Sequence, residues 1–270
     1  MPAILLARLK TLTVQLADAF YQPGLFRRRL FDILEFYADR TYRPGQSGRH
    51  VSLLPQFRVP QPVMRQIEIE LGLLAAAHPE EAFQLMAAIW ADGYLETRLL
   101  AIFLLSQVPP DPPEPLIERI RAWAKPGEDS TVLAALLSAG SSRLQRERPD
   151  LWQAIIEEWM RSPDPAIVGI GLRALHYLAR DSDFENLPVI FGLLIPAMQV
   201  VPSNLQADYL DLIETLARRS MPETAYFLRQ SINASSDPSI ARLVRKTLPF
   251  FNQQQQNGLK AALANQAKTR

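Results

Sequence analysis

The sequence contains no cysteine, and this absence excludes several kinds of site at once. Without cysteine the chain has no disulfide framework, no thiolate nucleophile and no zinc–thiolate centre. Its three histidines lie far apart, and none has a second ligand three or four residues away. A glycine-rich phosphate loop, a nucleophile elbow and an HExxH motif are missing as well. We therefore expect no metal site and no cofactor.

Long apolar runs are also missing. No stretch approaches the roughly 18 to 20 uncharged residues that a membrane-spanning helix needs. The first ten residues lack the small-residue cleavage site of a signal peptide. We therefore expect no membrane partner and, with cysteine absent, a cytoplasmic protein.

The net charge of +1 conceals an uneven distribution. Residues 1–60 carry nine Lys or Arg against four Asp or Glu, a balance of +5. Residues 241–270 carry six basic residues and no acidic one, so the middle has a balance of −10, since +1 −5 −6 equals −10. Two basic ends would suit a polyanion such as duplex DNA if the fold brings them to one face. The alternative is solvated helix ends and a tail.

Helical periodicity dominates, and one helical pattern recurs along the chain. It has an apolar residue at position 1, a small or apolar residue at position 5, and apolar residues at positions 8 and 9. The intervals between first positions are 34, 35, 35, 38 and 35 residues, and those positions are Val63, Thr97, Val132, Ile167, Leu205 and Ile240. Partner helices are expected between them, near residues 80–91, 114–124, 150–160, 184–198 and 222–231.

Such a repeat predicts an all-α protein, a HEAT-like or armadillo-type α-solenoid of about six antiparallel helix pairs. We expect a single α-solenoid domain over residues 1–270, with an N-terminal helix pair at 1–40 and repeats at 62–251. A basic, flexible loop is expected at 41–61, and a polar capping helix with a tail at 252–270. Long loops of this kind are either functional or disordered, and both interpretations stay open.

Three segments of the chain resemble the DNA alkylation repair (AlkD-like) family of HEAT-repeat glycosylases. They are residues 57–65 (FRVPQPVMR), 89–101 (IWADGYLETRLLA) and 158–165 (EWMRSPDP). In this family a proline-rich turn opens a helix, a Glu-x-Arg sits in a following helix, and a tryptophan-ended helix precedes a turn. The resemblance covers about residues 40–200 and implies a helical-repeat fold that binds DNA.

The chemistry that this resemblance implies is excision of a cationic alkylated purine. In the family an aspartate and tryptophans face the damaged nucleotide, and basic residues hold the DNA backbone. A carboxylate and aromatic faces stabilise the positive charge that develops as the base leaves. The corresponding stretch here, residues 128–140, lacks the expected tryptophan and has alanine and leucine where the aspartate would project. The arginine expected early in the helix after Pro165 is also missing, because the residues in that stretch include Val168 and Gly169 instead.

The best substitute for the missing catalytic group is Asp129 or Glu128 together with Trp123. The alternative is structural, with the carboxylates capping a helix that begins at Ser130 and the tryptophan buried. Glu96 and Arg98 are expected either to bind a phosphate or a partner, or to form an ion pair between repeats. Two further tryptophans lie seven residues apart on one helix face and are expected in the core, at positions Trp152 and Trp159.

Basic residues in three regions are candidate phosphate ligands, with an ordinary solvated surface as the alternative. These DNA-binding candidates are Arg27, Arg28, Arg29, Arg43, Arg49, Arg58 and Lys260. The leading hypothesis is a noncatalytic binding module whose concave face holds duplex DNA or a protein. One alternative is an active glycosylase that uses Asp129 and Trp123. Another is a protein–protein adaptor that does not touch nucleic acid.

Overall fold

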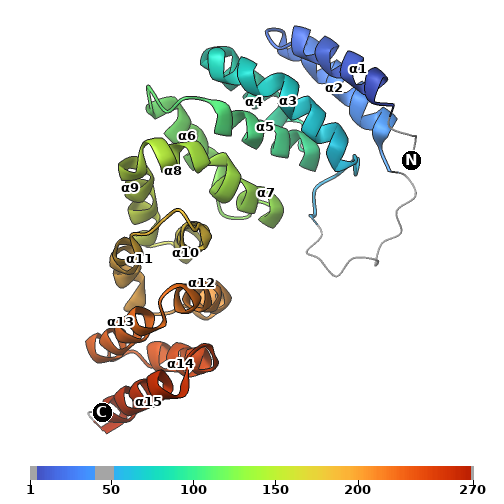
Figure 1. Ribbon diagram of the computed structural model, residues 1–270. Coiled ribbons are helices and arrows are strands. Elements are labelled where there is room, and N and C mark those ends of the chain that lie inside the picture. Colours follow the sequence, from blue (N-terminus) through green and yellow to red (C-terminus); the bar gives the residue numbers. More distant parts are fainter. Residues whose placement is uncertain (1–4, 40–51, 269–270) are drawn as a thin grey trace. The chain divides into compact units, whose positions relative to one another are not determined.

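The computed structural model describes residues 5–39 and 52–268, which form only helices, turns and extended segments (Figure 1). The all-α prediction is confirmed. Two compact units make up the chain, Met1–Pro149 and Asp150–Arg270. Within each unit the helices stack in chain order, as in an α-solenoid. The number of helix pairs and the single domain remain predictions, and predictions for residues 40–51, including Arg43 and Arg49, lie outside the described residues.

In the first unit, one layer of helices is built from every second helix along the chain. The contacts run from α1 to α3, from α3 to α5 and from α5 to α7, while α2 packs on α4. A π-helical stretch, Leu136–Gly140, extends α7. The bounds are α1 Leu6–Asp18, α2 Pro23–Tyr37, α3 Gln61–Ala77, α4 Pro79–Trp90, α5 Leu95–Gln107, α6 Glu114–Trp123, α7 Ser130–Ala135 and α8 Ser142–Glu147.

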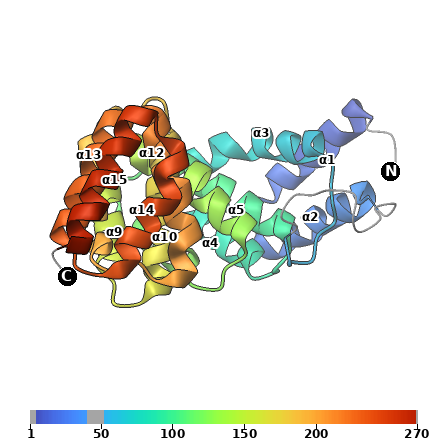
Figure 2. The same cartoon turned by 90° about the horizontal axis from the view of Figure 1, so that it is seen from below.

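The second unit repeats this plan. Helix α12 packs between α10 and α14 (Figure 1), and α13 packs on α15 (Figure 2). The bounds are α9 Pro149–Met160, α10 Pro165–Arg180, α11 Leu187–Leu194, α12 Gln206–Arg219, α13 Met221–Ala234, α14 Pro238–Thr247 and α15 Gln253–Lys268. Short 3₁₀ turns, Ile195–Met198 and Ser203–Leu205, lie between α11 and α12.

The repeated sequence pattern marks one layer in each unit. Its first positions lie in α3, α5, α7, α10 and α14 and, for Leu205, directly before α12. The expected partner helices are confirmed as α4, α6, α9, α11 and α13. Trp152 and Trp159 are buried against each other, with ring centroids 5.9 Å apart, so their predicted core role is confirmed. The short helix α8 and the π-helical stretch were not predicted.

Two glycines allow neighbouring helices to approach closely. A Cβ at Gly171 would lie 2.7 Å from Met160 Sδ, and one at Gly140 would lie 2.7 Å from Ile102 Cγ2. Helix starts follow the expected caps, because Asp164 accepts from Ala166 N at 2.9 Å and Asp237 accepts from Ser239 N at 2.7 Å. Among the described residues, no helix has the length and apolarity to cross a membrane.

Candidate functional site

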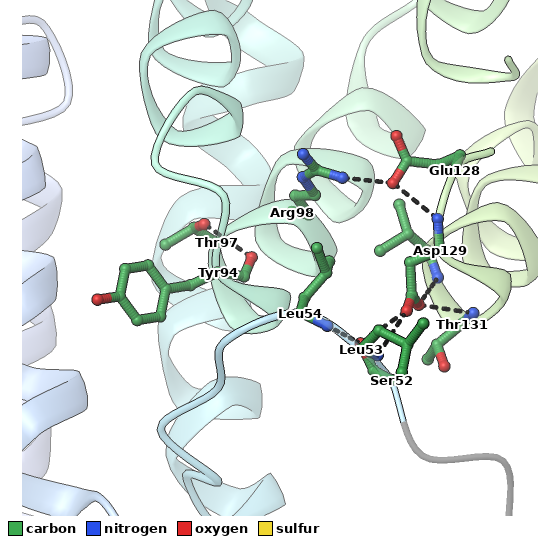
Figure 3. Close-up of polar contacts among 10 residues, drawn as sticks. Ser52, Leu53, Leu54, Tyr94, Thr97, Arg98, Glu128, Asp129 and Thr131 are labelled. Carbon is green, nitrogen blue, oxygen red and sulfur yellow. Dashed lines mark hydrogen bonds and ion pairs between the residues drawn. The ribbon is translucent and has the colours of Figure 1, made fainter.

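An extended segment of the first unit, residues 52–60, crosses the starts of α5 and α7; we call it the strap (Figure 3). Leu95 N, in the first turn of α5, donates to Pro55 O at 2.9 Å. Phe57 stacks on Tyr94 with ring centroids 4.7 Å apart and meets Phe31 edge-on at 5.6 Å. The strap is therefore fixed to the helices by backbone and aromatic contacts.

The carboxylate of Asp129 joins the strap to α7. Its Oδ2 accepts from Ser52 Oγ at 2.9 Å and from Leu53 N at 3.0 Å. Its Oδ1 accepts from the α7 backbone, at 2.9 Å from Thr131 N and 3.3 Å from Val132 N. Burial raises the pKa of Asp129, but the four hydrogen bonds outweigh it and lower the pKa below the ordinary value of an aspartate. Asp129 is thus an ionised helix cap and a latch for the strap.

A second carboxylate holds the other end of the strap. Glu96 is 6% exposed, and its Oε1 accepts from Arg58 N at 2.6 Å. Arg58 has a φ of 57°, in the left-handed region that residues other than glycine seldom adopt. Glu96 Oε2 is buried and has no hydrogen-bond partner among the described residues. Of the two residues expected to form an ion pair between repeats, Arg98 does so, whereas Glu96 holds the strap.

Arg98 forms its ion pair with Glu128, whose side chain is 2% exposed. The Arg98 guanidinium also lies 4.9 Å from the centre of the Trp90 ring. Trp90 stacks on Trp123 with a centroid distance of 3.9 Å and an interplanar angle of 4°. Trp123 is 3% exposed, so its indole belongs to the packing between α4 and α6. Among the described residues, this series of contacts links Trp123 to Asp129, because Asp129 N donates to Glu128 Oε1 at 3.0 Å.

The predicted phosphate ligands of the first unit differ in their contacts. Arg27 pairs with Asp92, and its Nε lies 2.9 Å from Asp92 Oδ1. Arg29 donates to the carbonyl of Gln15. Arg28 is exposed and makes no ion pair or hydrogen bond with any described residue. Among these three arginines, Arg28 alone has a guanidinium available for a ligand.

The second unit carries cations that the sequence analysis did not single out. Helix α14 has Arg242, Arg245 and Lys246 and no carboxylate between Pro238 and Thr247. Arg242 and Arg245 are exposed and form no ion pair or hydrogen bond within the described chain. Lys246 Nζ donates to Gln206 Oε1 at 2.6 Å, which ties α14 to α12. The predicted ligand Lys260, on α15, is also exposed and makes no such contact with the described residues. The excess of basic residues over residues 241–270 was the feature of the sequence that indicated these exposed cations.

Two of the grooves outside the strap region lie between neighbouring helices. One, of about 750 Å³, separates α11 from α13 and is lined by apolar side chains, among them Phe191, Ile195 and Tyr226. The other, of about 480 Å³, lies between α3 and α5 and contains Glu68. Burial raises the pKa of Glu68, and Arg65 opposes that rise. In the described part of the chain no group of three or more His, Cys, Asp or Glu residues is arranged to hold a metal ion.

Comparison with models of known protein families gives a match over the middle of the chain. A family model described as DNA alkylation repair enzyme matches residues 55–199, more than half of the 270 residues. The resemblance found in the sequence is therefore confirmed. No curated protein matches the chain. The matched range contains most of the strap and both residues of the Asp129–Trp123 hypothesis, and it ends before α12.

Proposed function

The chain belongs to the DNA alkylation repair enzyme family, and we propose that it is a noncatalytic member that binds duplex DNA. The observation that carries this proposal is the engagement of Asp129. All four of its hydrogen bonds come from the chain itself, two from the strap and two from α7. A carboxylate that is already saturated by donors does not offer an oxygen to a departing cationic base.

The tryptophan of the Asp129–Trp123 hypothesis is also engaged by the chain itself. Trp123 lies face to face with Trp90 and is almost wholly buried, so neither face of its indole is open to a base. Arg119 lies 5.5 Å from the centre of the same ring. Base excision through Asp129 and Trp123 would require the strap to detach and the tryptophan pair to separate. The glycosylase alternative is therefore the less favoured one.

Unpaired cations support DNA binding. Arg242 and Arg245 are exposed on a helix without acidic residues, and Arg28 is exposed in the first unit. Guanidinium groups that have no internal partner are available to neutralise phosphates, and each neutralised phosphate releases counterions. Arg242 and Arg245 lie three residues apart, hence on one face of α14.

A protein–protein adaptor is the second candidate function. The groove between α11 and α13 favours it, because its walls are apolar and Tyr226 and Ile195 are 57% and 54% exposed. An adaptor of this kind uses apolar and aromatic side chains as anchors for a partner. A protein–protein adaptor would show no affinity for duplex DNA, whereas the leading proposal requires such affinity.

The test of the leading proposal measures binding and base release in the same sample. The full-length protein is mixed with a fluorescent duplex that contains an N-alkylated purine. We expect binding without release of the base above the uncatalysed rate. Base release that disappears in Asp129→Asn would instead establish the glycosylase. Absence of binding even at low salt would leave the adaptor.

A further inference from the structure

The exposed apolar side chains of the second unit gather on one surface. Among the described residues of this unit, 150–268, the large apolar side chains that are exposed are those of Ile195, Val200 and Tyr226. Ile195 and Tyr226 line the groove of about 750 Å³ between α11 and α13. Val200 lines a smaller pocket of about 370 Å³, and Gln199 lines both. Single exposed apolar residues need no explanation, but a continuous apolar surface of this kind marks an interaction site.

The α13 wall of this groove extends over almost the whole length of the helix. A stripe of its lining residues lies at intervals of four positions, and these residues are Pro222, Tyr226, Gln230 and Ala234. They form one face along about 18 Å of α13, because each helical residue rises about 1.5 Å. On the opposite wall, Phe191 of α11 contacts Phe227 of α13 with ring centroids 5.1 Å apart. The groove is therefore a trough along α13 with an aromatic floor.

A glycine opens the α11 wall of the trough. Gly192 is exposed within α11, and a Cβ at this position would meet no heavy atom within 4 Å. Glycine weakens the interior of a helix relative to alanine, so the stability of α11 does not account for it. The backbone of a ligand can approach α11 closely at this point. Exposed residues along both walls leave the trough open, whereas sites for small molecules enclose most of their ligand.

The charge at this groove is negative. Glu223, in the first turn of α13, is the charged side chain among the described residues that line the groove, and these include no lysine or arginine. Its carboxylate is exposed and forms no ion pair or hydrogen bond with another described residue. A DNA backbone would be repelled here, whereas a basic side chain of a protein would be attracted.

We propose that the groove between α11 and α13 binds an amphipathic helix of a protein partner. Apolar side chains of that helix, at positions i, i+4 and i+7, lie along the aromatic floor, and a lysine or arginine lies near Glu223. A groove between two helices accepts the side-chain ridge of a third, as in the packing of the solenoid itself. The inference does not depend on DNA binding. The groove has no cationic lining residue among those described, and α13 lies beyond the family match, which ends at residue 199.

The experiment selects binders of the full-length protein from a phage-displayed library of helical hairpins, randomised on one face of one helix. We expect the selected helices to carry apolar residues at i, i+4 and i+7 and a basic residue near one end.

A substitution that fills the groove then tests where the selected helix binds. Gly192→Leu should weaken the binding of a fluorescently labelled hairpin by about tenfold or more, because the leucine side chain occupies the trough. The variant should unfold at the same urea concentration as the wild type or at a higher one, since leucine favours the helix. Gly24→Leu is the matched control, because Gly24 of α2 is a helical glycine with equally open surroundings. Its affinity for the hairpin should stay within about twofold of the wild type.

The role of Glu223 is tested with the same hairpin. Glu223→Gln should weaken its binding about threefold and reduce the dependence of that binding on salt, as expected for an exposed ion pair. An unchanged affinity and salt dependence would contradict the basic contact.

The remaining outcomes separate the helix site from the proposed function. A selection without binders, or binders that Gly192→Leu holds as tightly as the wild type, would overturn the helix site and leave DNA binding intact. A wild-type dimer that Gly192→Leu dissociates in sedimentation would show that a second copy of the chain covers the groove, which contradicts a different protein as partner. Duplex DNA should bind Gly192→Leu and the wild type equally. A joint loss of hairpin and DNA binding would mean that the groove is part of the DNA surface.

Discussion

The strap region of the first unit and helix α14 of the second unit use their charged residues in opposite ways. Around the strap, Glu96, Glu128 and Asp129 are all engaged by donors of the chain itself. On α14, Arg242 and Arg245 extend into solvent without an internal partner. Charges that are engaged internally hold a local structure together, whereas unpaired surface cations remain available to an external anion. The carboxylates of the strap region therefore stabilise the first unit, whereas α14 keeps two cations exposed to solvent.

The largest effect on stability is expected from substitution of Glu128. Glu128→Ala leaves Arg98 without its ion-pair partner, and it also removes the acceptor of Asp129 N. We expect a loss of about 3 kcal/mol in the free energy of unfolding, because a mostly buried cation loses its partner. Urea unfolding measures the change. The matched control is Glu147→Ala, whose exposed pair with Arg143 is worth about 0.5 kcal/mol or less. Equal effects of the two variants would contradict a structural role for Glu128.

A smaller loss is expected when the latch of the strap is removed. Asp129→Ala deletes the cap of α7 together with both bonds to the strap, and we expect a cost of about 2 kcal/mol in unfolding free energy. Asp164→Ala is the comparator, since Asp164 caps α10 through Ala166 N and holds no strap. It should cost about 1 kcal/mol. Hydrogen exchange at Leu53 should also become faster in Asp129→Ala alone; unchanged exchange would count against the latch.

The cations of α14 are expected to contribute to affinity rather than to stability. The double variant Arg242→Ala, Arg245→Ala should bind undamaged duplex about tenfold more weakly at low salt, and its salt slope should fall by roughly one unit for each lost phosphate contact. Its unfolding midpoint should match that of the wild type. Arg161→Ala is the control, because Arg161 is an exposed cation of the same unit that pairs with Glu157. An equal loss of affinity in the control would mean that α14 is not a preferred surface.

The smallest effect concerns Glu68, which lies in the groove between α3 and α5. Burial raises its pKa in the folded state, so the folded protein binds this proton more readily than the unfolded chain. Its stabilising effect is greatest below the unfolded pKa of about 4.3 and declines as the pH rises through the folded pKa. Glu68→Gln should therefore be slightly more stable than the wild type at pH 7, and not below pH 4. Glu118→Gln, exposed on α6, should show no such gain.

The sequence predicted the helices well because their signals are local. Apolar periodicity and the Asp-Pro starts located α10 and α14, and the 35-residue spacing identified the layer to which they belong. The π-helical stretch after α7 was not predictable in this way. It accompanies the close approach of Gly140 to Ile102 of α5, a contact between residues 38 positions apart.

The candidate site was only partly accessible from the sequence. The capping role of Asp129 follows from its place before Ser130, and the structure has that cap. Its hydrogen bonds to Ser52 and Leu53, however, join residues more than 70 positions apart, so the local sequence pattern does not predict them. The local sequence does not predict the pairing of Arg27 with Asp92 either. The run of three arginines therefore appeared more available to phosphate than it is. Availability depends on partners that only the fold brings close.

A salt titration of wild-type binding to a fluorescent undamaged duplex tests the central claim most directly. We predict measurable binding at low salt that weakens steeply and linearly in log–log form as the salt concentration rises, as expected when phosphates replace counterions around several arginines. Binding that is absent at low salt, or that does not change with salt, would contradict a DNA-binding function for this chain.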